Sequence, residues 1–235
     1  MRLYFIRHAQ SSNNALFDRT GAEQGRSDDP ELSDLGVRQA KLLAQHILET
    51  STGLEPGGFG LTHLYASPMV RAAHTASEIS SLTGLELHLW ADWHETGGIW
   101  LQNETGERIG RAGKNRAYLE QRFPGVRLPE GIGETGWWSR PAEPETQLQA
   151  RAKRVWQELL ERHGGTSDRV AVVSHGHFYV HVMAEIFGLE VGYGKAWWMK
   201  HNTAITRIDH LENEFDSTVL VYQNQVSHLP AGMVS

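Results

Sequence analysis

The chain lacks cysteine, long apolar runs and a positive net charge, and each absence excludes a class of function. None of its 235 residues is a cysteine, which excludes disulfides, a thiolate nucleophile and thiolate metal ligands. No apolar run approaches the roughly 20 residues of a membrane span. The formal net charge is −6, whereas nucleic-acid binders present a basic surface. Since Arg7 and His8 interrupt the first apolar run, no signal peptide is expected. We expect a cytoplasmic protein without nucleic-acid or membrane partners.

Two apolar stretches far apart in the sequence each end abruptly at a histidine. Leu3–Ile6 is followed by Arg7 and His8, and Val172-Val173 is followed by Ser174-His175-Gly176. Short apolar runs of this kind are typical of strands buried on both faces of a sheet. Because ligands bind at the carboxyl ends of strands in open α/β sheets, we expect both histidines in one site.

Strand-like and helix-like segments alternate along most of the chain. The expected strands cover Leu3–Ile6, Leu61–Ala66, Leu85–Trp90, Arg169–Val173, Ala204–Ile208 and Ser217–Tyr222. The expected helices cover residues 34–48, the segment after Ser67, Asn115–Phe123, Glu145–His163 and Phe178–Phe187. This alternation predicts a three-layer α/β fold, in which a mostly parallel sheet is flanked by helices on both faces.

Two serines are expected to cap helices. Ser33 precedes an amphipathic segment, and Ser67 precedes Pro68, which suits a first helical position because its missing N–H needs no partner there. Arg71 then falls in the first helical turn, where a cation opposes the helix dipole. That local cost favours a functional role for Arg71 over a structural one.

Residues 97 to about 145 differ in composition from the rest, being rich in Gly, Pro, Trp and Arg without a long period. We expect one domain over residues 1–235, in which this segment is an insertion that covers the strand ends as a lid. Substrate specificity is expected to reside there and in Gly192–Trp198. The insertion's cations are candidates for binding a second anionic group, although a solvated face is more usual. They are Arg111, Lys114, Arg116 and Arg140.

The tryptophans are expected to pack the core and lid, or to form an aromatic wall for the substrate.

Motifs spread over nearly the whole chain resemble those of the histidine phosphatase superfamily, which also contains the cofactor-dependent phosphoglycerate mutases. In chain order they are Arg7-His8-Ala9-Gln10-Ser11 with Asn14, Leu32-Ser33-Asp34-Leu35-Gly36 with Gln39-Ala40, Ser67-Pro68-Met69-Val70-Arg71-Ala72 with Thr75-Ala76, and Ser174-His175-Gly176. Glu95 fits the family's acidic residue just after a strand. The departure is Ala9, where the family usually has Gly, and its methyl is expected to narrow the phosphate pocket or shift the backbone.

The resemblance implies phosphoryl transfer through a phosphohistidine. His8 would be the nucleophile, and neighbouring arginines should keep its imidazole neutral near pH 7. Arg7 and Arg71 would clamp the phosphate through bidentate, charge-assisted hydrogen bonds. His175 would donate a hydrogen bond to the transferring group, and Gly176 would let the backbone come close.

Two further assignments carry alternatives. Glu95 would act as general acid and then as general base, which calls for a raised pKa. Asp92 and Glu104 are its nearby competitors. Asn14 would donate its side-chain amide to the phosphate, or it would instead cap a turn.

The phosphoryl acceptor separates a hydrolase from a mutase. The family's mutases resemble one another in an adjacent Arg-Arg pair in the insertion, whereas the cations here are spread over Gly110–Arg116. Glu95 is also followed by Thr96-Gly97-Gly98 rather than by the mutases' Arg-x-Tyr-Gly. We therefore expect hydrolysis of a small-molecule phosphomonoester without a cofactor, with a phosphoglycerate mutase-type phosphotransferase as the alternative.

Two other classes stay open. His175, His177 and His181 could form a metal cluster, since histidines at i and i+4 share a helix face, and Glu185 is the one carboxylate in that segment. Such a cluster would indicate a metal-dependent hydrolase, but no metal is expected beside the other motifs. A non-catalytic module that binds phosphorylated ligands could use the same scaffold. Against it, every proposed catalytic position holds a competent side chain.

Overall fold

A six-stranded sheet forms the middle layer of the computed structural model, which describes residues 1–49, 51, 54–191, 197–212 and 217–235. The strand order is β3-β2-β6-β1-β7-β8. The strands are β1 (Arg2–Arg7), β2 (His63–Ala66), β3 (Leu87–Leu89), β6 (Arg169–Ser174), β7 (Ile205–Leu211) and β8 (Ser217–Gln225). The first four in spatial order pair in parallel, and β7 pairs antiparallel with both β1 and β8. The expected α/β sheet, parallel over most of its width, is confirmed.

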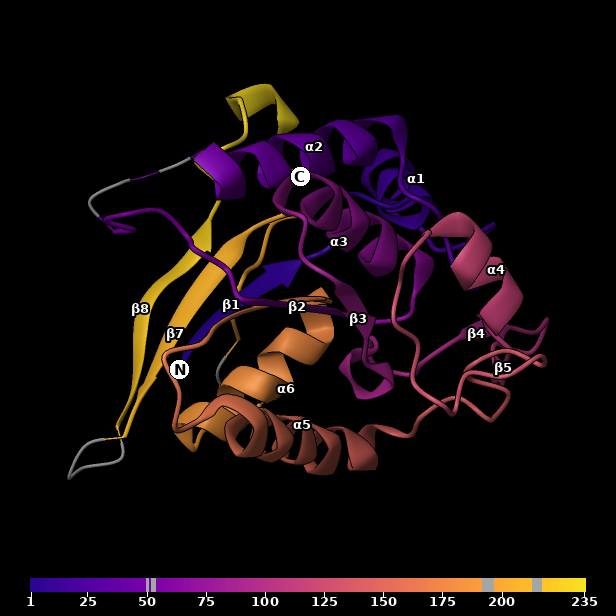
Figure 1. Ribbon diagram of the computed structural model, residues 1–235. Coiled ribbons are helices and arrows are strands. Elements are labelled where there is room, and N and C mark those ends of the chain that lie inside the picture. Colours follow the sequence, from indigo (N-terminus) through magenta and orange to yellow (C-terminus); the bar gives the residue numbers. More distant parts are fainter. Residues whose placement is uncertain (50, 52–53, 192–196, 213–216) are drawn as a thin grey trace.

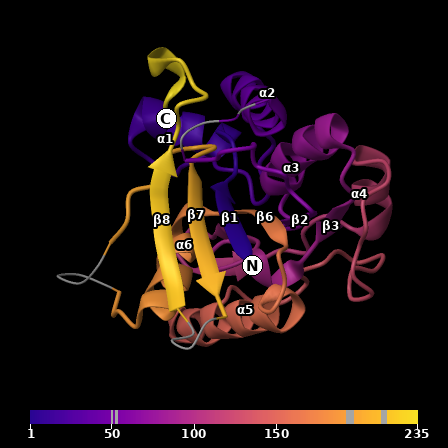
Figure 2. The same cartoon turned by 60° about the vertical axis from the view of Figure 1, so that its left-hand side comes forward.

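Helices cover both faces of this sheet (Figure 1). On one face lie α2 (Asp34–Glu49) and α3 (Val70–Thr83), and on the other lie α5 (Leu148–His163) and α6 (Gly176–Phe187). Figure 2 shows β8 along the outer edge, beside β7. None of the helices in the described part of the chain is long and apolar enough to cross a membrane.

The first strand shows why its sequence is continuously apolar. Leu3 and Phe5 face the cluster built with α5 and α6, whereas Tyr4 and Ile6 face the cluster built with α2 and α3. All four side chains are fully buried. Because successive strand residues point to opposite faces, a strand covered on both sides needs apolar residues at every position. Burying each such aliphatic or aromatic side chain contributes about 1.5–3 kcal/mol.

One of the two expected helix caps is confirmed and the other is wrong. Ser33 Oγ accepts a hydrogen bond from the Gly36 N–H at 3.0 Å, as an N-cap should. Helix α3 starts only at Val70, and Ser67 Oγ instead accepts from the Met69 N–H before the helix. The Val70 N–H donates to Asp29 Oδ1 at 3.0 Å. A carboxylate from a distant loop therefore satisfies the helix start, which local sequence patterns do not reveal.

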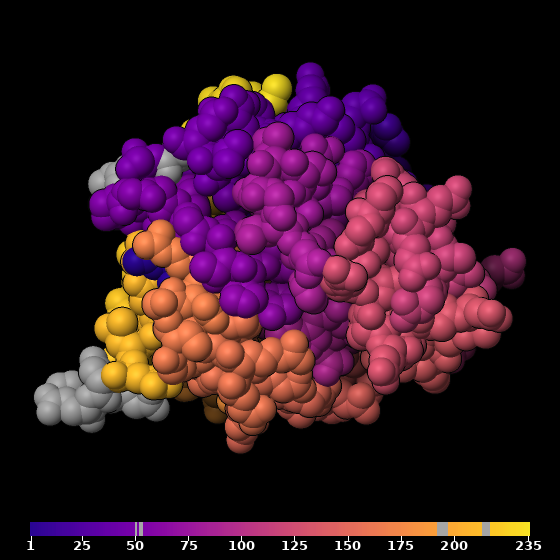
Figure 3. Space-filling view, in the orientation of Figure 1, coloured from indigo at the N-terminus to yellow at the C-terminus, as the bar shows by residue number. Residues whose placement is uncertain are grey.

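One helix and two short strands were not expected from the sequence. Helix α1 (Ser12–Thr20) has no fully buried residue, so it carries little hydrophobic periodicity. Within the insertion, α4 (Arg116–Arg122) was expected, but the hairpin of β4 (Trp100–Gln102) and β5 (Arg108–Gly110) was not. Strands of three residues are too short to show an alternating pattern. Figure 3 shows the insertion (pink) packed beside α3 (magenta), with α5 (orange) below. Residues 192–196 of the second expected specificity segment lie outside the described residues.

Candidate active site

The pairing of β1 with β6 brings the two sequence-predicted histidines together. In the parallel register Arg7 lies opposite Ser174, and the His8 N–H donates to the Ser174 carbonyl at 2.9 Å. The rings of His8 and His175 follow directly, with centroids 5.1 Å apart and planes at 59°. They lie at the carboxyl ends of their strands, next to a cleft of about 460 Å³ that His8 lines.

The hydrogen bonds of His8 define which ring nitrogen is available. Nδ1 lies 2.7 Å from the Ala9 carbonyl oxygen. Because a carbonyl can only accept, Nδ1 must carry the proton, and Nε2 then keeps its lone pair. Arg71 Nε donates to that Nε2 at 3.1 Å. Burial, then the charges of Arg71 and Arg7, hold the pKa of His8 well below its ordinary value. The imidazole is therefore neutral at pH 7.

Several buried polar atoms around His8 have no partner in the described part of the structure. They are Nε of Arg7 and both ring nitrogens of His175. Arg7 is nonetheless held in place, because its Nη1 donates to the carbonyl of Lys200. Burial, then Arg71, lowers the pKa of His175 well below its ordinary value. Buried polar groups without partners are rare, so these atoms indicate that a polar ligand belongs here.

Glu95 lies at the N-terminus of α6, on the edge of the same cleft. Its Oε1 accepts from the backbone N–H groups of Thr96 and Phe178, each at 2.9 Å, and Oε2 accepts from His177 N–H at 3.3 Å. Burial would raise the pKa of Glu95, but His177, these N–H donors and Arg71 together lower it below its ordinary value. The expected raised pKa is wrong for the free site, because a helix N-terminus stabilises the carboxylate.

Arg151 fixes the segment that carries Glu95. This buried side chain of α5 donates to the carbonyls of Asp92 and His94 at 2.7 and 2.9 Å. Its other nitrogens make a bidentate pair with Glu143 at 2.7 and 2.8 Å. One guanidinium thus ties together α5, the end of the insertion and the turn before Glu95. No sequence pattern indicates this role, since Arg151 is one of several arginines on an amphipathic helix.

The competing acids fall outside the cleft, whose described lining includes neither of them. Asp92 Oδ2 accepts from Arg154 Nε at 2.9 Å, and Glu104 is exposed in the hairpin turn. Of the three carboxylates considered, Glu95 alone lines the cleft with His8.

The structure bears on the roles that were expected of three neighbouring residues, Asn14, Ala9 and Gly176. Asn14 takes the capping role that was the alternative to phosphate binding, because its Oδ1 accepts from the Ser11 N–H at 3.1 Å. It also lines the cleft, so its amide group can still donate there. The Ala9 methyl packs with Leu32 and α2, away from the cleft, so it does not narrow the pocket. A Cβ on Gly176 would lie 3.4 Å from Arg7 Nε, an ordinary contact, so glycine is not sterically required there.

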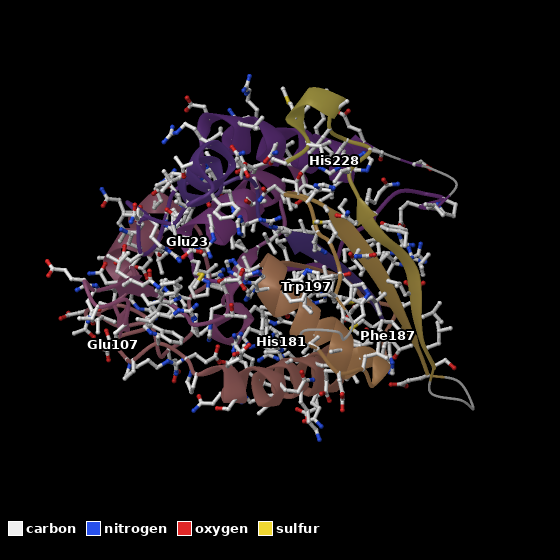
Figure 4. The ribbon with its side chains drawn as sticks, turned by 180° about the vertical axis from the view of Figure 1, so that it is seen from behind. Glu23, Glu107, His181, Phe187, Trp197 and His228 are labelled. Carbon is white, nitrogen blue, oxygen red and sulfur yellow. The ribbon has the colours of Figure 1, made fainter. Side chains whose placement is uncertain are left out.

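The histidines of the alternative metal cluster do not converge. His177 is exposed, and its ring packs edge-on against Trp197, with centroids 5.6 Å apart. His175 is fully buried beside His8, and His181 lies further along α6 (Figure 4). Among the described residues these three do not form a group with metal-ligand spacing.

The outer cleft combines tryptophans from the expected aromatic wall, Trp100, Trp197 and Trp198, with Arg26 and Arg108, which the sequence did not single out. Arg26 and Arg108 stack on the ring of Trp100, with guanidinium carbons 4.0 and 4.3 Å from its centroid. Exposed apolar side chains form the opposite rim, among them Trp197 and Met199. Figure 4 views this face, with Trp197 beside α6 and Glu23 across from it. The four cations expected from the insertion are not among the described lining residues.

A backbone anchor for His8 comes from the segment before β7. Asn202 Nδ2 donates to the His8 carbonyl at 2.9 Å, and Thr203 N–H donates to the Arg7 carbonyl at 3.1 Å. Thr203 has a positive φ of 59°, which is uncommon for a β-branched residue. Strained backbone of this kind persists where surrounding contacts enforce it, often at functional sites.

Asp29 gives a stability prediction with a defined sign. Its Oδ1 lies 3.9 Å from Arg71 Nη1. Burial raises the pKa of Asp29 to about 6, with partial offset from Arg71 and the Val70 N–H. The unfolded carboxyl titrates near its ordinary value of about 3.9. Between these values the native state binds more protons, so the contribution of Asp29 to the free energy of unfolding falls as pH rises, by about 3 kcal/mol in total.

Urea unfolding of the wild type and of Asp29→Asn, from pH 4 to pH 7, measures how the contribution of Asp29 to the free energy of unfolding changes with pH. The wild type should lose stability relative to the variant as pH rises through the window. Glu104→Gln, at an exposed position of the hairpin turn, is the matched control. A difference between wild type and Asp29→Asn that stays constant with pH would contradict the prediction.

Comparison with known proteins agrees with this geometry. The family model for the histidine phosphatase superfamily (branch 1) matches residues 3–223. A probable phosphoglycerate mutase from Yersinia pestis is 25% identical over 214 residues, which cover 91% of this chain and 86% of the relative.

Two solved structures are similar in fold. A phosphoserine phosphatase mutant from Entamoeba histolytica, in complex with phosphoserine, has 20% identity and a TM-score of 0.62, and the match covers 97% of this chain and 99% of that one. A mycobacterial glucosyl-3-phosphoglycerate phosphatase has 22% identity and a TM-score of 0.61, over 95% and 98% of the two chains. Because the family model spans nearly the whole sequence, from the first strand to the last, the chain belongs to the histidine phosphatase superfamily.

Proposed function

We propose that this protein hydrolyses small phosphomonoesters through a phosphohistidine formed on His8. The observation that carries the proposal is the state of the His8 imidazole. Its Nδ1 is tied to a carbonyl, its Nε2 lone pair meets Arg71, and burial keeps the ring neutral. The unpartnered donors of Arg7 and His175 beside it supply what a phosphoryl group requires.

In the first half-reaction Nε2 of His8 attacks phosphorus, and the P–O bond to the leaving group breaks. Arg71 exchanges its hydrogen bond with Nε2 for one with a phosphate oxygen, and Arg7 and the Asn14 amide bind the others. His175 donates a hydrogen bond to the transferring group. Charge-assisted donors held in this way stabilise negative charge in the transition state.

Glu95 supplies the proton that the leaving alkoxide needs. In the free site its pKa is lowered, but a phosphate dianion beside the carboxylate raises that pKa, because like charges disfavour ionisation. In the second half-reaction the ionised carboxylate takes a proton from water, the water oxygen attacks phosphorus, and the N–P bond breaks. Inorganic phosphate and free His8 result, so the cycle balances.

One feature of the substrate follows from the outer cleft. Arg26 and Arg108 both stack on the indole ring of Trp100. Glu23 forms an ion pair with Arg26 at 3.1 Å, but not with Arg108. Arg26 Nε is also buried without a partner among the described residues. We propose a substrate that carries a second anionic group at this end. Because Trp100 and Arg108 belong to it, the insertion at about 97–145 sets specificity within a single domain.

A mutase remains the second candidate, favoured by the Yersinia pestis relative named a probable phosphoglycerate mutase. It would share the first half-reaction and use a second substrate hydroxyl in place of water. We propose a metal-independent route, because arginine and histidine side chains fill each charge-stabilising role. A cytoplasmic location is also proposed, supported by the cysteine-free composition.

The central test is hydrolysis of an aryl phosphate in excess chelator. His8→Ala should lose at least about 10⁴-fold in kcat/KM, as removal of a nucleophile does. His88→Ala, which removes an exposed histidine that does not line the cleft, is the matched control. Wild-type protein denatured with detergent at alkaline pH, where the N–P bond of phosphohistidine survives, should carry a phosphoryl group that His8→Ala lacks. Chelator-sensitive turnover, or unchanged turnover in His8→Ala, would refute the phosphohistidine route.

Glu95→Gln should separate substrates by leaving group. For an alkyl phosphate, kcat/KM reports the first half-reaction and should fall about 10²–10⁴-fold without the acid. For an aryl phosphate the loss should be much smaller, because a phenolate leaves without full protonation. Asp92→Asn, which alters a nearby carboxylate outside the cleft, should change neither. Equal losses for both substrates would argue against Glu95 as the acid.

Arg108→Gln tests the second anionic subsite. The measurement compares 3-phosphoglycerate with glycerol 3-phosphate, which carries a hydroxymethyl group in place of the carboxylate. Loss of one charged hydrogen bond should lower kcat/KM about tenfold for the first and leave the second unchanged. Arg111→Gln, on an exposed cation of the insertion, is the matched control. An equal effect on both substrates would mean that Arg108 does not read the second charge.

A further inference from the structure

A second group of polar side chains lies at the end of the sheet opposite to the cleft. It consists of His63, His163 and Asp168, and one donor atom from each lies within 4.8 Å of the others. Among the residues that the structure describes, no other trio of potential metal ligands is so close. The proposed reaction uses none of the three.

Three different elements deliver these side chains to one point. His63 is the first residue of β2, Asp168 immediately precedes β6, and His163 is the last residue of α5. Strands β2 and β6 are parallel neighbours, with His63 opposite Val170, so their amino ends share an edge. His175 follows the other end of the six-residue β6. At about 3.3 Å per residue, the two sites are about 20 Å apart.

We propose that His63, His163 and Asp168 bind a zinc ion. Asp168 Oδ2 lies 2.9 Å from His163 Nδ1 and 3.9 Å from His63 Nδ1. Ligands bonded tetrahedrally to zinc at 2.0–2.2 Å are about 3.3 Å from one another. The two separations bracket that value, so small rotations of the side chains bring all three atoms into bonding range.

The surrounding hydrogen bonds allow the required tautomers. His163 Nδ1 carries a proton where it meets Asp168, and Nε2 lies 3.1 Å from the Tyr65 hydroxyl. If the proton moves to Nε2, that nitrogen donates to Tyr65, and Nδ1 is free to bind metal. A hydroxyl accepts as readily as it donates. Tyr65 would then be the outer partner that orients a zinc-bound histidine.

Access and ligand chemistry favour zinc over the hard cations. The side chains of His63 and Asp168 are 41% and 25% exposed, so an ion and a fourth ligand, water, can enter. His63 Nδ1 also lies 2.9 Å from Thr62 Oγ1, a contact that zinc would replace. Two imidazoles and one carboxylate suit zinc, whereas magnesium and calcium take oxygen ligands. The ion would join the end of α5 to the sheet, which is a structural role.

The test is zinc titration of the full chain by calorimetry, after chelator treatment and dialysis. The wild type should bind one equivalent at this site, and its thermal unfolding midpoint should rise with zinc. His63→Ala and Asp168→Asn should each lower the affinity at least about tenfold and remove the thermal shift. Neither change is in the core, and Asp168→Asn preserves side-chain shape.

Two controls separate this site from others. His88→Ala removes a half-exposed histidine that is not one of the three proposed ligands. Its ring centroid lies 5.9 Å from that of Tyr65, the outer partner of His163. This variant should bind zinc like the wild type. His8→Ala should also retain binding, while aryl phosphate hydrolysis by the wild type should be the same with and without zinc. Absence of a one-to-one complex, equal affinity in His63→Ala and Asp168→Asn, or loss of binding in His8→Ala would each overturn the proposal.

Discussion

The parallel pairing of β1 with β6 is the constraint on which the site depends. It sets Arg7 opposite Ser174, so the next residue of each strand is a histidine at the same edge. Slippage by one residue would turn His8 or His175 to the wrong face, because strand side chains alternate. The fully buried residues on both faces of β1 hold the register, since any slip would move Leu3 and Phe5 out of their cluster. The packing of the core against β1 therefore also sets the relative positions of His8 and His175.

Burial gives this site its electrostatic character. Arg71 and His8 are both almost fully buried, and a desolvated imidazole beside arginines stays neutral. Burying cations is costly unless they are paired. Asp29 partners Arg71, and Glu143 partners Arg151. These two acidic residues, which the proposed reaction does not use, therefore allow both arginines to occupy low-dielectric positions. In such surroundings the hydrogen bond that we propose from Arg71 to a phosphate is strengthened.

The two candidate sites use opposite ends of the same strands. At the carboxyl ends, Arg7 and Arg71 lie beside His8 and favour an anion. At the amino ends, the histidines and Asp168 gather as electron-pair donors and favour a cation. Strand β6 connects the two, with Asp168 just before it and His175 just after it. The sheet thereby separates groups of opposite preference by the length of one strand.

The sequence alone determined the layered α/β fold, the family, and the positions of Arg7, His8, Arg71 and His175 relative to their strands and helix. These follow from local patterns, because strand apolarity and short motifs are written in consecutive residues. Tertiary structure alone decided the rest. The start of α3 depends on Asp29, the pKa of Glu95 on the N-terminus of α6, and the cleft cations on Arg26 and Arg108 stacking on Trp100. Asp29 and Val70, Glu95 and Phe178, and Arg26 and Trp100 are each far apart in the chain, and no periodicity or spacing in the sequence encodes their contacts. Arg108 meets Trp100 only through the hairpin of β4 and β5, whose strands are too short to show a pattern.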